Sequence, residues 1–320
     1  MRIALVVLFL ASIGMVSLAV ISAQDAPKLA DAAKRVELEA AFFADAPPLK
    51  AESGEAWNMP GVSVEAKDGR QKGAAVRLKA RYDSTNIYLL AQWADASKSD
   101  VKAAWEFKDG KWTRQKGDED RLALAFNVNS PSFKEKGCAG ICHVSSEKKM
   151  HCLNEGEQVD LWHWKAARGG QNGWADDQVI NATKRGDDKG KSAYKKNENG
   201  KDASLPGWVW AEQADRTTGF EESAIVAIGP EFRPADGEKL PSNVMRKPEG
   251  SRADVQAFAA YADGKWTVLF VRKLDTGNAD DAKFAAGEDI LFSLAVMDDC
   301  GTTDGDEHAV SELCVLRLKK

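Results

Sequence analysis

Hydrophobic and polar residues alternate with a period of two in the segment 74–82. Val76, Leu78 and Ala80 are separated by basic residues, and a second apolar run, Asn86–Trp93, follows after a short polar turn. An alternation of this kind gives a strand one buried face and one solvated face. The pattern therefore predicts a half-buried antiparallel hairpin.

Two further hairpins are predicted by Asp-Gly turns, at Asp109-Gly110 and at Asp263-Gly264, each followed by Lys-Trp. Asp-Gly between apolar runs is the strongest short hairpin signal. Other segments with strand character are Val255–Tyr261, Thr267–Arg272, Arg121–Val128, Asp289–Met297 and Ser311–Leu318. Short helices are expected near Asp31–Phe43 and Asn278–Phe284. We expect an all-β fold, an antiparallel β-sandwich with long irregular insertions and a few short helices.

The N-terminus has the composition of a secretory signal. A basic residue, Arg2, precedes an apolar run, and small residues stand before a polar start at Gln24, which predicts a signal peptide over 1–23. An uncleaved membrane anchor is the alternative. Residues 24–320 are expected to form one exported, periplasmic β-sandwich domain, with an insertion at about 131–250 that carries the chemistry.

The formal net charge of the chain is −5, and its basic residues form no regular patch. Such a chain is a poor nucleic-acid binder. The sequence contains no recognisable nucleophile motif, paired catalytic carboxylates or phosphate-binding glycine loop, so we expect no independent enzymatic turnover.

One segment has the residues needed for covalent haem attachment: Cys138-Ala-Gly-Ile-Cys142-His143. Two thiols can bond the haem vinyl groups, and the following imidazole can coordinate the iron. The spacing has three residues between the cysteines instead of the usual two. A disulfide, free thiols, or a zinc or copper site that includes His151 or Cys152 are alternatives, and the pairing of Cys152, Cys300 and Cys314 stays open.

The segment Asp160-Leu-Trp-His-Trp-Lys165 places Trp162 and Trp164 on one face of a strand and His163 and Lys165 on the other. Two indoles on one side can form the wall of a porphyrin slot, and core packing is the alternative. In the haem interpretation, His163, Lys165 and Arg168 are candidates for contacts with the haem propionates.

Several segments resemble the haem-binding gamma-subunit family of ethylbenzene dehydrogenase and of the type II dimethyl sulfoxide reductase-like molybdoenzymes, which includes the nitrite oxidoreductase small subunit. The similar segments cover most of the chain after the signal, in the order of the family. They are Ile87–Asp95, Gly137–His143, Asp160–Lys165, Asp263–Val268, Arg272–Gly277 and Phe292–Asp298.

This resemblance implies a β-sandwich whose haem exchanges electrons with a molybdenum-containing catalytic subunit through an iron–sulfur subunit. The family holds a b-type haem with a methionine before the Trp-containing strand and a lysine near the C-terminal strand. Met150 stands in the first place, and His308 stands where the lysine would be. Met150 and His308 are therefore the expected axial pair, with His143 as the ligand below a covalent haem and His151 in reserve.

These observations predict an exported haem protein that transfers electrons. It would act as the cytochrome subunit of a molybdenum oxidoreductase or as a free periplasmic cytochrome with a soluble redox partner. A single c-type haem is favoured, and an additional or alternative b-type haem is the second possibility. The competing function is an exported carbohydrate- or ligand-binding β-sandwich without haem, because tryptophan-rich antiparallel modules also bind sugars.

Overall fold

The computed structural model describes residues 35–52, 54–69, 73–141, 150–216, 219–299 and 308–319. Residues 35–320 form one compact unit. The predicted signal peptide and the residues Cys142, His143 and Cys300 lie outside the described residues. No helix in the described part of the chain is long and apolar enough to cross a membrane.

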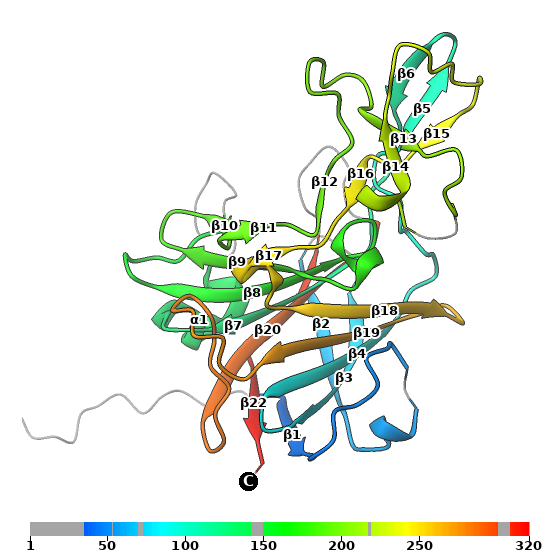
Figure 1. The fold of residues 1–320 in the computed structure, drawn as a ribbon. Helices are drawn as coiled ribbons and strands as arrows, with labels where there is room; N and C mark the ends of the chain where they lie inside the picture. Colours follow the sequence, from blue (N-terminus) through cyan, green and yellow to red (C-terminus); the bar gives the residue numbers. More distant parts are fainter. Residues whose placement is uncertain are drawn as a thin grey trace, which may run out of the picture. The chain divides into compact units, whose positions relative to one another are not determined.

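Thirteen of the described strands belong to one hydrogen-bonded sheet that folds back on itself (Figure 1). Its strands are β1 (Glu37–Phe42), β2 (Val62–Gly69), β3 (Ala74–Tyr82), β4 (Asn86–Ala94), β7 (Arg121–Asn127), β8 (Gln158–Lys165), β9 (Asp176–Asn181), β10 (Arg185–Asp187), β18 (Gln256–Ala262), β19 (Lys265–Lys273), β20 (Asp289–Met297), β21 (Ala309–Ser311) and β22 (Cys314–Leu318).

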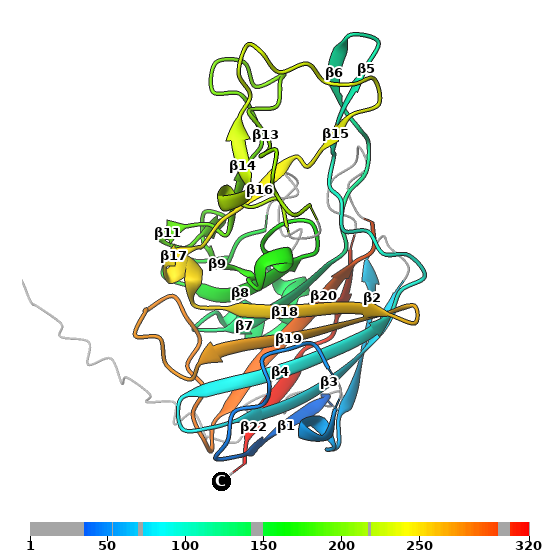
Figure 2. The same cartoon turned by 45° about the vertical axis from the view of Figure 1, so that its right-hand side comes forward.

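The order β10-β9-β8-β7-β20-β21-β2-β3-β4-β19-β18 gives two layers that are joined through β21, β22 and β1. One layer contains β7, β8 and β20, and the other contains β3, β4 and β19, which lie together in Figure 2. Apolar side chains from both layers fill the space between them. The all-β sandwich is thereby confirmed, and its pairs are antiparallel except where β1 lies parallel to β22 and β3.

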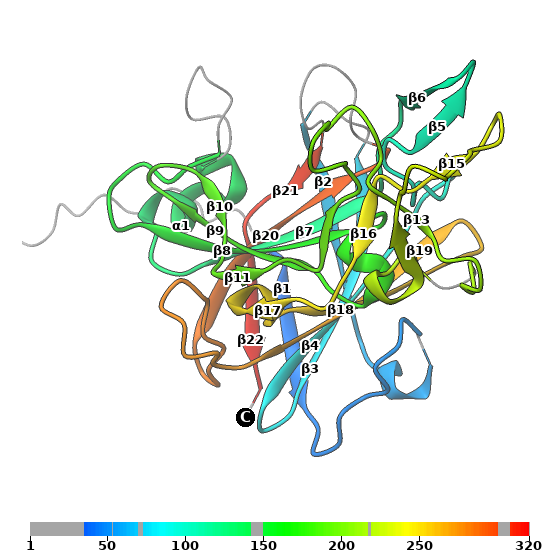
Figure 3. The ribbon, with the colours of Figure 1, turned by 45° about the horizontal axis from the view of Figure 1, so that its top comes forward.

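Short strands outside the main sheet form four small sheets, one of which, with β5, β6 and β15, projects from the sandwich at the upper right of Figure 3. They are β5 (Trp105–Lys108) with β6 (Lys111–Arg114) and β15 (Lys239–Leu240), β13 (Trp208–Trp210) with β14 (Ile225–Ala227), β12 (Tyr194–Lys196) with β16 (Asn243–Met245), and β11 (Gly190–Lys191) with β17 (Glu249–Gly250).

Helical structure is limited to short pieces in the described residues. The α-helix α1 spans Pro131–Lys136, and its N-cap Ser130 accepts a hydrogen bond from the backbone N–H of Phe133. The 3-10 turns are η1 (Glu55–Trp57), η2 (Gly137–Gly140), η3 (Gly169–Asn172), η4 (Glu222–Ala224) and η5 (Ser251–Ala253).

The two Asp-Gly hairpins are confirmed as β5–β6 and β18–β19. In both turns the aspartate has a φ of 52°, and Gly110 and Gly264 have φ values of 75° and 67°. Two consecutive residues with positive φ match the right-handed twist of the flanking strands. This requirement explains why Asp-Gly occurs at both places.

The two predicted helices are wrong. Residues 37–42 form β1, in which Leu38 and Ala40 face the core while Glu37 and Glu39 are exposed. This alternation has the period of a strand. Residues Asn278–Phe284 form an irregular loop, and Phe284 inserts into the core.

The main sheet also includes strands from the segment 131–250, in which we expected an insertion. β8 lies between β7 and β9, and all eight of its residues are buried or half-buried. β8 was predicted as a strand, but both of its faces are covered and carry buried polar residues such as Asp160 and His163, so its sequence does not show that it lies inside the sheet. Residues outside the sandwich come instead from two stretches, at 98–118 and 189–250.

Candidate functional site

Trp164, one of the predicted site residues, lies in the core between the two layers. Its indole packs edge-on against Trp266 of β19, with ring centroids 4.9 Å apart, and against Trp93 of β4 at 5.9 Å. Trp266 is fixed by a 2.9 Å hydrogen bond from its Nε1 to Asp120. Trp164 is 1% exposed, so its faces are occupied by protein.

Trp162 is enclosed in the same way, two residues earlier on the same face of β8. Its ring lies 4.6 Å from Phe126 and 5.7 Å from Phe284, and the guanidinium of Arg272 lies over it at 5.2 Å. The two indoles share one face as predicted. That face packs in the core, which was the alternative interpretation of this segment.

His163 points to the opposite face of β8 and is 2% exposed. Neither ring nitrogen has a hydrogen-bond partner. Burial lowers the pKa of this imidazole well below its ordinary value, and nearby Lys165 lowers it further. His163 is therefore a neutral imidazole inside the protein.

Lys165 and Arg168 are engaged in buried ion pairs. The Nζ of Lys165 donates to Asp176, and the Nε of Arg168 donates to Glu119 at 2.6 Å. The Tyr194 hydroxyl also donates to Asp176, at 3.1 Å. These cations already have carboxylate partners within the chain, so their charges are balanced without a propionate.

Burial lowers the pKa of Lys165 to about 8, although its partner Asp176 opposes the shift. Between about pH 8 and pH 10.5, the ordinary lysine value, the Lys165 amine is therefore mostly protonated in the unfolded chain and mostly neutral in the folded chain. Stability must rise with pH in this window. We expect urea unfolding to show this rise in the wild type and a smaller rise in Lys165→Met. Equal slopes in the two proteins would contradict the assignment.

Two of the remaining described candidates belong to a second, smaller apolar cluster. Cys138 is buried in it, and Met150 packs against it. The backbone N–H of Cys138 donates to Ser293 at 3.2 Å, and the Nδ1 of His151 lies 2.8 Å from the carbonyl oxygen of Cys152. His308 is half-buried and precedes β21. The other half of the predicted attachment motif lies outside the described residues.

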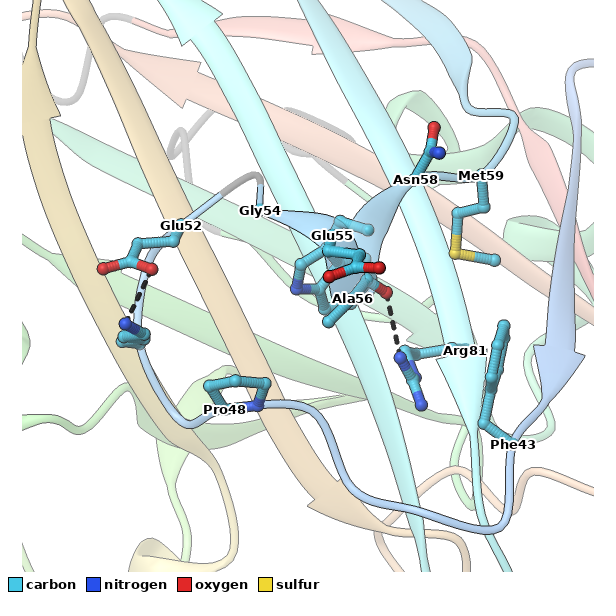
Figure 4. A pocket seen from close by; sticks show the side chains of 11 residues that line it. Phe43, Pro48, Glu52, Gly54, Glu55, Ala56, Asn58, Met59 and Arg81 are labelled. Carbon is cyan, nitrogen blue, oxygen red and sulfur yellow. Dashed lines mark hydrogen bonds and ion pairs between the residues drawn. The ribbon is translucent and has the colours of Figure 1, made fainter.

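A cavity of about 540 Å³ lies beside β3, under the loop that joins β1 to β2 (Figure 4). This volume is in the range of small-molecule sites. Its lining combines apolar and polar side chains, and we refer to it as the β3 pocket: Phe43, Pro48, Lys50, Glu52, Gly54, Glu55, Ala56, Trp57, Asn58, Met59 and Arg81.

Arg81 of β3 organises the β3 pocket. Its guanidinium donates to the carbonyl oxygens of Ala56 at 2.9 Å and of Asp45 at 2.7 Å, and its Cζ lies 3.8 Å from the centre of the Phe43 ring. Lys79 supports the same loop through a 2.6 Å bond to the carbonyl oxygen of Trp57. The loop is therefore anchored to the sheet at three carbonyl groups.

The base of the β3 pocket is rigid because Trp57 is buried on the outer face of the sheet, among Tyr88, Leu90 and Leu269. The rim is accessible, since Glu55 and Asn58 are exposed and Phe43 is 38% exposed. Figure 4 shows the Phe43 ring beside Arg81 and the Glu55 carboxylate across from it. Arg81 covers one face of the Phe43 ring, so the pocket offers the remaining exposed part of that ring together with hydrogen-bond acceptors and donors.

A family model described as ethylbenzene dehydrogenase matches residues 40–309. The chain belongs to this family. The match includes most strands of both layers and every lining residue of the β3 pocket of this ethylbenzene dehydrogenase family protein. No curated protein matches the chain.

Solved structures similar to this ethylbenzene dehydrogenase family protein are carbohydrate-binding proteins. A family 9 carbohydrate-binding module from Caldicellulosiruptor kristjanssonii in complex with cellotriose is 9% identical, with 88% of this chain and 93% of that chain covered and a TM-score of 0.36. A putative carbohydrate-binding protein from Bacteroides uniformis ATCC 8492 is 8% identical, with coverages of 89% and 100% and a TM-score of 0.38.

The prediction of an electron-transferring haem protein is corrected here, because the described residues that were expected to surround the haem have other partners within the chain. Within the described residues, the indoles expected to form a porphyrin slot pack against other aromatic rings in the core. The cations expected at propionates pair with Asp176 and Glu119.

The sequence did not point to the β3 pocket. Phe43 and Trp57 lie in a loop without periodicity, and Arg81 reads as a residue on the polar face of a strand. The only hint in the sequence that Arg81 is buried is its position between Ala80 and Tyr82 at the end of the strand. Arginine is rarely buried unless it has partners.

Proposed function

We propose that this chain is an exported ligand-binding β-sandwich without haem and without turnover of its own, and that a carbohydrate is the ligand of the β3 pocket. The observation that supports this most directly is the pocket itself. It combines a partly exposed aromatic ring, at Phe43, with the carboxylate of Glu55 and the amide of Asn58 on the same rim.

The chemistry of the lining fits a sugar. A pyranose has an apolar face of C–H groups, which can lie on an aromatic ring, and a rim of hydroxyl groups that donate and accept hydrogen bonds. Glu55 can accept from hydroxyls, and the Asn58 amide can both donate and accept. The buried base and the anchored loop hold these groups in place before binding, which lowers the entropic cost of binding.

Alanine in place of Phe43 is expected to weaken saccharide binding at least tenfold, because the aromatic face of the β3 pocket is lost. Isothermal titration of the purified protein with glucose and cellotriose, the ligands of the similar solved structures, measures this effect. Glu55→Gln should weaken binding too, since it replaces a charged acceptor with a neutral one.

Phe42→Ala provides the matched control. Phe42 is the neighbouring aromatic residue, is 53% exposed, and packs against Tyr82 with ring centroids 5.3 Å apart. It is not part of the pocket lining. Equal losses in Phe42→Ala and Phe43→Ala would show that the β3 pocket is not the site, and no saturable binding of any saccharide would overturn the proposal.

Family membership supports a narrower proposal on partners, namely that this sandwich is the gamma-type accessory subunit of a larger molybdenum oxidoreductase. The match over residues 40–309 supports it. Co-purification of the native protein with catalytic and iron–sulfur subunits from its own cells is the expected result. Recovery of the chain alone under gentle extraction would contradict it.

A further inference from the structure

Four acidic side chains converge inside the sandwich, away from the β3 pocket. Asp160 lies on β8, Asp177 on β9, Asp188 directly after β10, and Asp281 in the loop after β19. They are 1%, 0%, 6% and 3% exposed. Carboxylate oxygens of Asp160, Asp177 and Asp281 all lie within 4.8 Å of one another. We refer to the four residues as the buried carboxylate cluster.

The strand register explains why these residues meet. Asp177 is paired with Trp162, and Asp160 precedes Trp162 by two residues, so both carboxylates are on the core face of the layer. Asp281 reaches the same place because the adjacent Ala282 donates its N–H to Asp160 at 3.0 Å. The cluster is thus built by the sheet itself and by one anchored loop.

Several oxygens of the buried carboxylate cluster have no protein partner. Neither oxygen of Asp177 accepts a hydrogen bond, and Asp160 Oδ1 and Asp188 Oδ1 accept none. A fully buried carboxylate without a donor is costly. Asp177 is fully buried with both oxygens unpartnered, and one of its oxygens lies within 4.8 Å of an oxygen of Asp160 and of Asp281.

The local charge balance is negative. The Arg272 guanidinium donates a hydrogen bond to Asp160, and the Thr276 hydroxyl donates one to Asp281 at 2.5 Å. Four carboxylates against one guanidinium leave an excess of acidic groups in a region without solvent. Burial, and then repulsion from Asp160, Asp281 and Asp188, raises the pKa of Asp177 well above its ordinary value.

We propose that the buried carboxylate cluster binds one calcium ion, with Asp160, Asp177 and Asp281 as ligands and Asp188 at the edge of the site. Calcium takes six to eight oxygen ligands in flexible geometry, with carboxylates prominent among them. Sulfur and imidazole ligands, which zinc prefers, are absent from the four residues. The ion supplies a partner to an oxygen of each of the three ligands and joins β8, β9 and the 274–288 loop.

A second arrangement of the same atoms is possible, in which the carboxyl groups share protons and hold no metal. The two arrangements differ in measurable ways. A proton-sharing cluster gives a stability that does not depend on calcium. A calcium site gives a protein whose melting temperature follows the concentration of the ion.

Thermal unfolding of the full-length folded protein in EDTA and in millimolar calcium chloride is the test, together with a count of calcium per chain after dialysis. We expect one calcium per chain and a melting temperature about 5–10 °C higher in calcium, which corresponds to an ion about a hundredfold above its dissociation constant. Equal melting temperatures in both buffers would overturn the proposal.

Asp177→Asn separates loss of the site from loss of the fold. The amide removes a ligand charge and also removes repulsion, so this variant should be at least as stable as the wild type in EDTA and should gain nothing from calcium. Asp263→Asn is the matched control, because it makes the same change in a hairpin turn where Asn tolerates the positive φ. A calcium response that persists in Asp177→Asn would overturn the ligand assignment.

Discussion

Replacing Trp164 with alanine is expected to lower the free energy of unfolding by about 3–5 kcal/mol, the range measured for removal of a large buried aromatic side chain. Trp164 contacts Trp93 and Trp266, which belong to the opposite layer of the sandwich. The substitution leaves a cavity between the layers, which cannot close without moving strands. Urea unfolding followed by circular dichroism measures the loss.

Two control substitutions test whether the loss comes from the contacts of Trp164 between the layers. Trp164→Phe should cost much less than the alanine variant, because it retains an aromatic ring and removes an indole N–H that has no hydrogen-bond partner. Trp112→Ala, in the half-exposed part of β6, should cost less than half as much. If Trp164→Ala is no worse than Trp112→Ala, then Trp164 does not hold the layers together.

Replacing Arg272 with methionine is expected to cost about 3–5 kcal/mol, because it leaves the buried carboxylate of Asp160 without its partner. The guanidinium is fully buried and donates to Asp160 and to the carbonyl oxygen of Ala282. It also lies over the rings of Trp162 and Phe284, at 5.2 and 5.1 Å. Chemical unfolding in EDTA, where no calcium ion can balance the Asp160 charge, measures the effect.

Arg317→Met is the matched control for this substitution. Arg317 also forms ion pairs, with Glu37 and Asp289, but on the surface, where water screens the interaction. Its replacement should have a much smaller effect. Adding Asp160→Asn to Arg272→Met should restore part of the stability, since the isolated charge is removed. No restoration would mean that the loss comes from packing of the arginine.

The strands and hairpins could be predicted because their signals are local. Val76, Leu78 and Ala80 alternate with basic residues, and the Asp-Gly turns need positive φ values that few residue pairs adopt as readily. β1 was missed because it lies parallel to β22 and β3, and a six-residue strand gives little pattern to distinguish it from a helix. Pairing between residues 37–40 and 315–318 is not encoded locally.

The candidate sites were harder to predict because they depend on contacts across the chain. Trp162 and Trp164 were correctly placed on one face of a strand, but the residues that cover that face cannot be predicted from the local sequence. By the same alternation Asp160 falls on the face of these two indoles, and a carboxylate on the apolar side of a strand is a signal that a partner must exist. Finding Asp177 and Asp281 beside it required the fold.

The measurement that tests the central proposal most directly is a crystal structure of the chain with cellotriose. We expect a sugar ring in the β3 pocket, lying on Phe43 with its hydroxyl groups at Glu55 and Asn58. Cellotriose bound elsewhere in the chain, or an empty β3 pocket at saturating ligand, would contradict it.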